Sequence, residues 1–406
     1  MGQFALGLAL VIAGSWLATP PIVLLGIVIA FAEGVRQVWV RYGMAGVEYR
    51  RSIPEPRVVV GDEMRLDIVV WNRKALPLAW LRVEDEASAR VVVRERDLTD
   101  GAGRAVLRNA WTLAPYERVT RHFHVVAERR GVYSLGPARL ATGDLFAREA
   151  ALGDEARIDR WLVRPRQVAV AIHERDERWG GERRARRGPI EDPTRYAGVR
   201  PYQPGDSIRR VHWRATARTG SPVSRRFEPG REREVVVVLD LMTVNGPLGV
   251  LEFDDDAVET LCVAAASIVR RLRADGAAVG LAAPGHAGGT RPFALVPPGS
   301  AGDQVGRCLD LLARLGSTSS VPFGWLVTML LRQVRPGTSF VVLSARDPSV
   351  LAPVLRRVAA SGHPVQLVAM GAGATPGAPV ARGGGLDIRL GRLDGPWQTA
   401  TTLVIA

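Results

Sequence analysis

The feature that most constrains this chain is an uncharged apolar run near its start. Residues 4–32 read FALGLALVIAGSWLATPPIVLLGIVIAFA and contain no Asp, Glu, Lys or Arg. As a single helix the run would extend about 43 Å, well beyond the roughly 30 Å hydrocarbon core of a bilayer. Because Thr19-Pro20-Pro21 interrupts it near the middle, we predict two short transmembrane helices joined by a proline turn, over residues 1–35.

The flanking charges predict the orientation of this hairpin. A cleaved signal peptide is the alternative, but no Lys or Arg precedes the apolar run and no small-x-small site in it makes a convincing cleavage site. Four arginines occur in a predicted linker over residues 36–55, and an excess of positive charge marks the cytoplasmic side. Only two cysteines occur, which also fits a reducing compartment. We therefore expect a plasma-membrane protein with both soluble parts in the cytoplasm. The four arginines are Arg36, Arg41, Arg50 and Arg51.

Residues 56–150 follow a different pattern. Segments such as MRLDIVVWN and RHFHVVAER alternate apolar and polar residues, with Gly, Pro and Asn between them. Short strands with turns at this spacing predict a β-sandwich-like domain. His122 and His124 would share one strand face, but no third metal ligand stands at useful spacing. We interpret them as residues of an exposed face.

Residues 233–371 alternate strand and helix patterns. EVVVVLD at 234–240 is a continuous apolar run of the buried parallel type, and further strand and helix patterns follow up to PVQLVAM. This rhythm predicts an α/β domain with a doubly wound sheet. Its binding sites would lie in the loops that begin at Asp240, Ser344 and Gly371. We expect residues 372–406 to form a C-terminal tail with short strands.

Several enzyme classes are excluded by missing residue types. Lys74 is the single lysine, so a P-loop and a Schiff-base lysine are both absent. No Gly-x-Ser-x-Gly nucleophile elbow occurs. GAGATPG at 371–377 lacks the third glycine of a dinucleotide fingerprint, and the acidic cluster at 254–256 fits the cap of a helix. We therefore expect a protein without catalytic residues.

Most of the net positive charge lies in a predicted basic linker, residues 151–232. Residues 157–233 contain 20 arginines against 10 acidic residues, in a chain whose net charge is +13. Such a strip could bind nucleic acid or anionic lipid. No zinc finger or aromatic RNA platform accompanies it, so a solvated linker is the preferred interpretation and nucleic acid is an unfavoured partner.

Within this linker, YQPGDSIRRVHWRATARTG predicts a helix over 207–218, capped by Asp206 and ended by Gly220. One face would be buried and anchor the segment. Arginines spaced four residues apart would form an exposed stripe, and Arg209 would stack on Trp213. The predicted buried residues are Ile208, Val211, His212 and Ala215, and those of the stripe are Arg210, Arg214 and Arg218.

The segment GVRPYQPGDSIRRVHWRATARTG is similar to the hallmark of domain-of-unknown-function family 58, membrane proteins with a von Willebrand factor A-like domain. The resemblance implies that residues 233–371 are such a domain. It also implies a MoxR-type AAA+ ATPase as partner, in an assembly or chaperone-like role. The residues that match the hallmark are Arg200, Tyr202, Pro204, Gly205, Asp206, Arg209, Trp213, Ala217 and Arg218.

A von Willebrand factor A domain often binds Mg²⁺ through Asp-x-Ser-x-Ser and later Thr and Asp ligands. Here the first ligand would be Asp240, but apolar residues stand at both serine positions, with Thr243 nearby. Thr318 and Asp347 could replace the later ligands. The missing hydroxyls argue against a standard metal site, so we expect no metal or other cofactor.

We therefore predict a membrane-anchored, non-enzymatic interaction or scaffold protein. Binding of nucleic acid or anionic lipid by residues 157–233 is the first alternative. A metal-dependent hydrolase using Asp240 and Asp347 ranks last, because no nucleophile and general base can be paired from the sequence.

Overall fold

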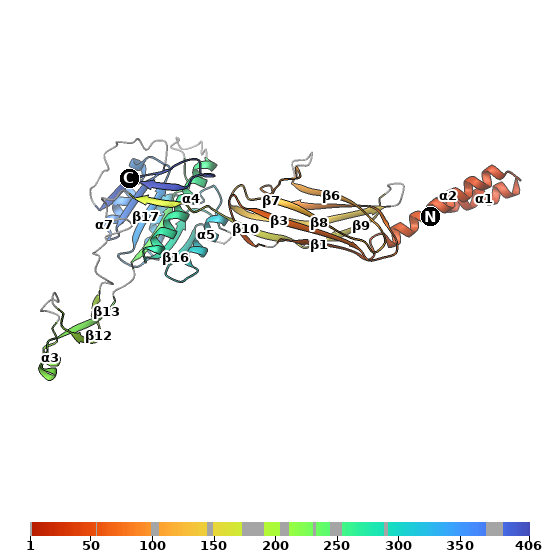
Figure 1. Ribbon diagram of the computed structural model, residues 1–406. Coiled ribbons are helices and arrows are strands. Elements are labelled where there is room, and N and C mark those ends of the chain that lie inside the picture. Colours follow the sequence, from red (N-terminus) through yellow and green to blue (C-terminus); the bar gives the residue numbers. More distant parts are fainter. Residues whose placement is uncertain are drawn as a thin grey trace. The chain divides into compact units, whose positions relative to one another are not determined.

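The chain divides into two compact units, Met1–Arg164 and Pro165–Ala406. Figure 1 shows both units in a computed structural model. The structure describes residues 2–53, 55–98, 105–143, 149–172, 191–203, 211–229, 233–243, 254–287, 291–370 and 385–406.

Unit 1 begins with two apolar helices, α1 (Gly2–Trp16) and α2 (Pro20–Tyr42), which lie side by side (Figure 1). Small residues allow this close packing: a Cβ on Gly26 would lie 2.7 Å from the Gly7 carbonyl oxygen. The predicted turn is confirmed, with Pro at the start of α2. α2 is long and apolar enough to cross a bilayer, whereas α1 is shorter.

α2 does not end at residue 35 as predicted; it continues to Tyr42, into the expected linker. The first charged residue after the apolar run, Glu33, is paired with Arg36 one turn later at 2.6 Å. This pair satisfies the charge within the helix, so the end of the uncharged run is not the end of the helix.

The rest of unit 1 is a β domain, residues 47–164, which confirms the predicted β-rich region. Two sheets form it (Figure 1). The first contains, in spatial order, β1 (Val47–Ser52), β3 (Glu63–Asn72), β7 (Arg118–Val126) and β5 (Val92–Val93). The second contains β2 (Arg57–Val59), β10 (Asp159–Arg164), β8 (Gly131–Gly143), β4 (Leu78–Ala87) and β6 (Val106–Leu113), with β9 (Glu149–Glu155) paired to β8.

Alternation along the strands separates the core from the surface of the β domain. In β3, Leu66, Ile68 and Val70 are buried while the residues between them are more exposed. In β7 the same rule places His122 and His124 on the outer face, as predicted, where about half of each side chain is exposed. They contact carboxylates on neighbouring segments rather than each other: Asp67 and Glu95, respectively.

A buried arginine ties the two sheets together. Arg51 of β1 in the first sheet donates from Nη1 to Oδ1 of Asp85 of β4 in the second sheet at 2.6 Å. Its Nε lies 3.1 Å from Oδ2 of Asp159 at the start of β10. The Arg51 side chain is 1% exposed, and the Tyr49 hydroxyl also donates to Asp85. Burial is the main cause that raises the pKa values of both Tyr49 and Asp85.

Gly136 makes room for this guanidinium. A Cβ at Gly136 would lie 2.5 Å from Nη1 of Arg51, and the backbone φ of 99° is one that other residues rarely adopt. Only glycine provides both the backbone conformation and the space that the buried Arg51 guanidinium requires at this position.

Unit 2 contains an eight-stranded mixed sheet with helices. Its spatial order is β11-β20-β19-β18-β17-β14-β15-β16, and the five neighbouring strands from β19 to β15 are parallel. The strands are β11 (Ala169–Ile172), β14 (Glu234–Leu239), β15 (Ala278–Ala283), β16 (Ala294–Gly299), β17 (Ser339–Ser344), β18 (Val365–Ala369), β19 (Leu386–Leu393) and β20 (Thr402–Ile405). The helices beside the sheet are α4 (Asp255–Ala274), α5 (Gln304–Arg314), α6 (Phe323–Leu331) and α7 (Pro348–Ala360).

Helices cover both faces of the central strands. Val236 and Val238 of β14 share a buried cluster with residues of α6 and α7, whereas α4 contacts β14 and β15. All residues of β14 after Glu234 are buried, as its continuous apolar run predicts. The predicted cap is also confirmed, since Asp254 accepts from the amides of Asp256 and Ala257.

The sheet extends beyond residues 233–371, the range expected for the α/β domain. β19 and β20, in the expected C-terminal tail, lie within it, and β11 pairs in parallel with β20. Short strands at a chain end thus complete the sheet because their backbone groups find partners there.

We expect Arg51→Met to lower the free energy of opening of β1 and β4 by about 3 kcal/mol, because Asp85 then stays buried without its cation. Hydrogen–deuterium exchange of the strand amides measures this. Arg50→Met is the control, since Arg50 is 76% exposed and contacts Glu48 at the surface. Equal effects of the two substitutions would contradict a structural role for the buried charge.

Candidate functional site

The carboxyl ends of β14 and β17 form the site that the fold itself favours. The chain runs from β14 outward to β15 and β16 on one side, and then returns to β17 on the other side of β14. At such a reversal of strand order the connecting loops diverge and leave a crevice. Asp240 follows β14 directly, and Ser344 ends β17 beside it.

Asp240 is fully buried and its carboxylate is held by three donors. Oδ2 accepts from Ser344 Oγ at 2.9 Å and from Arg346 Nε at 2.7 Å, and Oδ1 accepts from the Met242 amide at 3.3 Å. The Arg346 side chain is 11% exposed, so the ion pair is largely shielded from water. An internal cation therefore meets the carboxylate at the switch point of the sheet.

The electrostatics of Asp240 combine two opposing effects. Burial is the larger and raises the pKa of the Asp240 carboxyl, because it disfavours the charged form. Arg346 and Ser344 act in the opposite direction, by charge and by hydrogen bonding. The guanidinium supplies the positive charge that a divalent cation would bring to a carboxylate at this position.

The other residues considered as metal ligands are also engaged elsewhere or exposed. Thr243 Oγ1 accepts from the Asp254 amide at 2.8 Å, and Asp347 caps α7 by accepting from the Ser349 amide at 2.7 Å. This bonding lowers the pKa of Asp347. Thr318 lies in an exposed loop. In the described parts of the chain, no three His, Cys, Asp or Glu side chains cluster as metal ligands. These residues do not fit a standard Mg²⁺ site.

The arginine-rich hallmark forms a second candidate surface. Strands β12 (Glu191–Pro201) and β13 (Val223–Pro229) pair as an antiparallel two-stranded sheet, and α3 (Trp213–Thr219) lies between them in sequence. The Tyr202 amide donates to the Pro222 carbonyl at 3.0 Å, which continues the pairing to the start of the connection between the two strands. Gly220 ends α3 with a φ of 69°.

The prediction of a helix over 207–218 is wrong in its start. Val211 forms a β-bridge with Ser224, and the His212 amide donates to the Val223 carbonyl at 2.8 Å, so both residues pair with β13 rather than start a helix. His212 is the N-cap, since its Nδ1 accepts from the Ala215 amide at 3.1 Å. Asp206, the predicted cap, lies outside the described residues.

The predicted buried face is not seen within α3 itself, which has no buried residue; Ala215 is half-buried. Of the expected apolar face, Val211 is buried, but in the bridge rather than in the helix. Trp213 is 66% exposed, and Arg214 and Arg218 are exposed with it. An indole and two guanidinium groups on one short helix thus face solvent.

The remaining hallmark residues are only partly described. Arg200 lies on β12 opposite Ser224, and Tyr202 follows that strand. Ile208 lies outside the described residues, as do Pro204, Gly205, Asp206, Arg209 and Arg210.

Sequence reasoning missed Arg346 as a partner of Asp240. The signal available was SARD at the end of an apolar strand, residues 344–347. The Ser344 hydroxyl reaches Asp240 from the last residue of β17, and the Arg346 guanidinium reaches it from two residues further along the chain.

A family model matches the middle of the chain. Residues 198–345 match the model of a family described as protein of unknown function DUF58, which confirms the resemblance predicted from the hallmark. The chain is also similar to the uncharacterized protein YeaD of Bacillus subtilis strain 168, at 24% identity over 249 residues. The matched stretch is 60% of this chain and 57% of YeaD, so just over half of that relative's length is covered.

Solved structures resemble smaller parts of the chain. The structure of Escherichia coli alpha-2-macroglobulin from domain MG7 to the C-terminus matches 31% of this chain and 17% of its own, with 23% identity and a TM-score of 0.22. A type I cohesin–dockerin complex from Clostridium thermocellum matches 29% of this chain and 98% of its own, with 12% identity and a TM-score of 0.20. Scores this low carry no functional argument.

Replacing Arg346 tests whether the internal cation holds the site together. We expect Arg346→Met to lower the free energy of opening of β14 and β17 by about 3 kcal/mol, because Asp240 is left buried without its partner. Burial raises the pKa of Asp240, so the folded state takes up a proton more readily than the unfolded state. The loss of opening free energy caused by Arg346→Met should therefore shrink as the pH falls, because a protonated Asp240 carries no charge.

Hydrogen–deuterium exchange at several pH values measures this deficit. The matched control is Arg335→Met, which removes an arginine that is 69% exposed and contacts Glu234 at the other end of β14. A deficit of equal size in both variants, or one independent of pH, would contradict the assigned role of Arg346.

Proposed function

Taking the match of residues 198–345 to the DUF58 family as the premise, we propose that this is a membrane-anchored, non-enzymatic interaction protein. Its α/β domain is of the von Willebrand factor A-like type and engages a MoxR-type AAA+ ATPase in an assembly or chaperone-like role. α2 would be the anchor, and Arg36 and Arg41 near its end support a cytoplasmic location of the following domains.

The observation that carries this proposal is the exposed surface of α3. Trp and Arg are the residue types most enriched among those that dominate the energy of protein interfaces. A Trp side chain that is 66% exposed beside Arg214, in a helix without a buried residue, leaves most of its surface open to a partner. A partner surface would cover the indole and pair with the guanidinium groups.

The chemistry of the Asp240 site supports a role in binding rather than in turnover. A hydrolase would need Asp240 or Asp347 free to hold a metal or to move a proton. Asp240 is held by Arg346 and Ser344, and Asp347 caps a helix. A lysine P-loop is absent from the sequence, so nucleotide hydrolysis would come from the partner.

We expect Trp213→Ala combined with Arg214→Ala to reduce recovery of the ATPase about tenfold or more, because both side chains would contact it. Co-purification from membranes in mild detergent with nucleotide present measures the recovery. Arg332→Ala is the control, as Arg332 is an exposed arginine of the same unit. The double variant should keep its thermal stability, since Trp213 is exposed. Failure of the intact protein to recover any AAA+ ATPase would reject the proposal.

A second candidate function rests on the basic charge of residues 157–233. Arg214, Arg218 and Arg225 are exposed and would meet phosphate groups of an anionic membrane or of a nucleic acid. Such binding weakens steeply with salt. We expect the protein to be retained on anionic vesicles or DNA at low ionic strength only if this candidate is correct. No retention, or retention that salt does not change, would eliminate it.

A further inference from the structure

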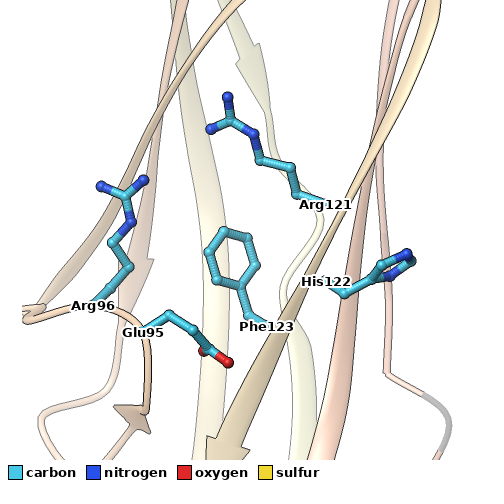
Figure 2. A pocket seen from close by; sticks show the side chains of 5 residues that line it. All are labelled: Glu95, Arg96, Arg121, His122 and Phe123. Atoms are coloured by element: carbon cyan, nitrogen blue, oxygen red, sulfur yellow. The ribbon is translucent and has the colours of Figure 1, made fainter.

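The β domain contains an open pocket that the proposed function does not use. It lies between the segment after β5 and the middle of β7, has a volume of about 480 Å³, and is lined by Glu95, Arg96, Arg121, His122 and Phe123. Figure 2 shows its lining side chains. Pockets that hold small organic molecules have volumes of about 300–1,000 Å³, so the space is sufficient for one.

Arg121 occupies an inward position on β7. It shares a strand face with Phe123 and Val125, which are both buried, and its guanidinium lies over the Trp111 ring at 4.7 Å from the ring centre. Desolvation and the nearby charge of Arg96 lower the pKa of Arg121. The strand therefore places a partly desolvated cation where alternation would otherwise place an apolar residue.

Two like charges face this pocket without a described carboxylate to neutralise them. Glu95 is the carboxylate in the lining, but it is held by His124, whose amide donates to Oε2 at 3.0 Å and whose Nδ1 contacts Oε1. No ion pair joins Arg96 or Arg121 to a carboxylate among the residues described. In Figure 2 both guanidinium groups lie toward one end of the pocket and the Glu95 carboxylate toward the other, with the Phe123 ring between them.

We propose that this pocket binds a small organic carboxylate with an aromatic or apolar body. The guanidinium groups of Arg96 and Arg121 take the carboxylate, since planar forks of N–H donors match its two oxygens. Most of the Phe123 ring is buried, and the part of it that lines the pocket contacts the body of the ligand. Binding also relieves the repulsion between the two arginines. This site is independent of α3 and of any ATPase partner.

A structural explanation competes with this proposal. β5 pairs with β7 at Val125 and Val126, and the Arg94 amide donates to the His124 carbonyl at 2.9 Å, so the backbone of β7 before His124 has no partner from β5. An inward charge such as Arg121 can protect a free edge from pairing with another chain. In that case the arginines would have no ligand.

Fluorine NMR titration of the detergent-solubilised full chain distinguishes the two explanations. The probes are para-fluorophenylacetate and its uncharged amide, which have the same body and differ in charge. We expect saturable binding of the carboxylate and at least tenfold weaker binding of the amide. Inorganic phosphate should compete poorly, because it lacks the apolar body.

Substitutions locate the binding. Arg96→Gln and Arg121→Gln should each weaken binding of the carboxylate probe about tenfold to a hundredfold, which is the usual effect of losing hydrogen bonds to a charged group. Arg118→Gln is the matched control, since Arg118 is an exposed residue on the outer face of the same strand. Arg96 is exposed, so its replacement tests the site even if Arg121→Gln perturbs the fold.

Three results would overturn the proposal. They are no saturable binding of the carboxylate by about 10 mM, equal binding of the carboxylate and the amide, and an equal loss in Arg118→Gln and Arg96→Gln. Any of them would leave protection of the strand edge as the explanation for the two arginines.

Discussion

Both units of this protein are organised around a buried carboxylate that an arginine neutralises. In the β domain Asp85 is fully buried and held by Arg51, and in the α/β domain Asp240 is fully buried and held by Arg346. A buried charge is tolerated only when a counter-charge and hydrogen bonds replace the water that it has lost. In each unit the pair joins two strands far apart in the sequence, so the positions of those strands are coupled to it. Arginine suits this task because its planar fork serves several acceptors at once.

The strands whose burial follows a regular pattern along the chain could be predicted from the sequence. β14 is buried on both faces and reads as a continuous apolar run, whereas β3 has one buried face and reads as an alternation. The start of the hallmark helix could not be predicted in the same way. Val211 and His212 have the spacing of a helical face, but their backbone groups bond to β13, some twelve residues later. The spacing of apolar residues does not show that a strand later in the chain competes for the same backbone groups.

The position of the candidate site was predicted, but Arg346, the partner of Asp240, was not. The rule that ligand sites lie at the carboxyl ends of parallel strands led to Asp240 and Ser344. The partner of Asp240 depends on the neighbouring strand: β14 and β17 pair in a register that aligns Leu239 with Leu343, and Arg346 follows three residues later. More than a hundred residues separate Asp240 from Arg346, so only the strand order brings them together. The inward position of Arg121 likewise follows from which face of β7 is buried.

The short connection between α2 and β1 limits how far the β domain can travel. α2 ends at Tyr42 and β1 begins at Val47, so residues 43–46 alone separate them. Four extended residues reach at most about 14 Å. With α2 in the bilayer, as proposed, this short connection keeps the β domain next to the lipid head groups. The β domain then moves with its anchor in the plane of the membrane, so a partner anchored in the same membrane meets it at a higher effective concentration than free solution would allow.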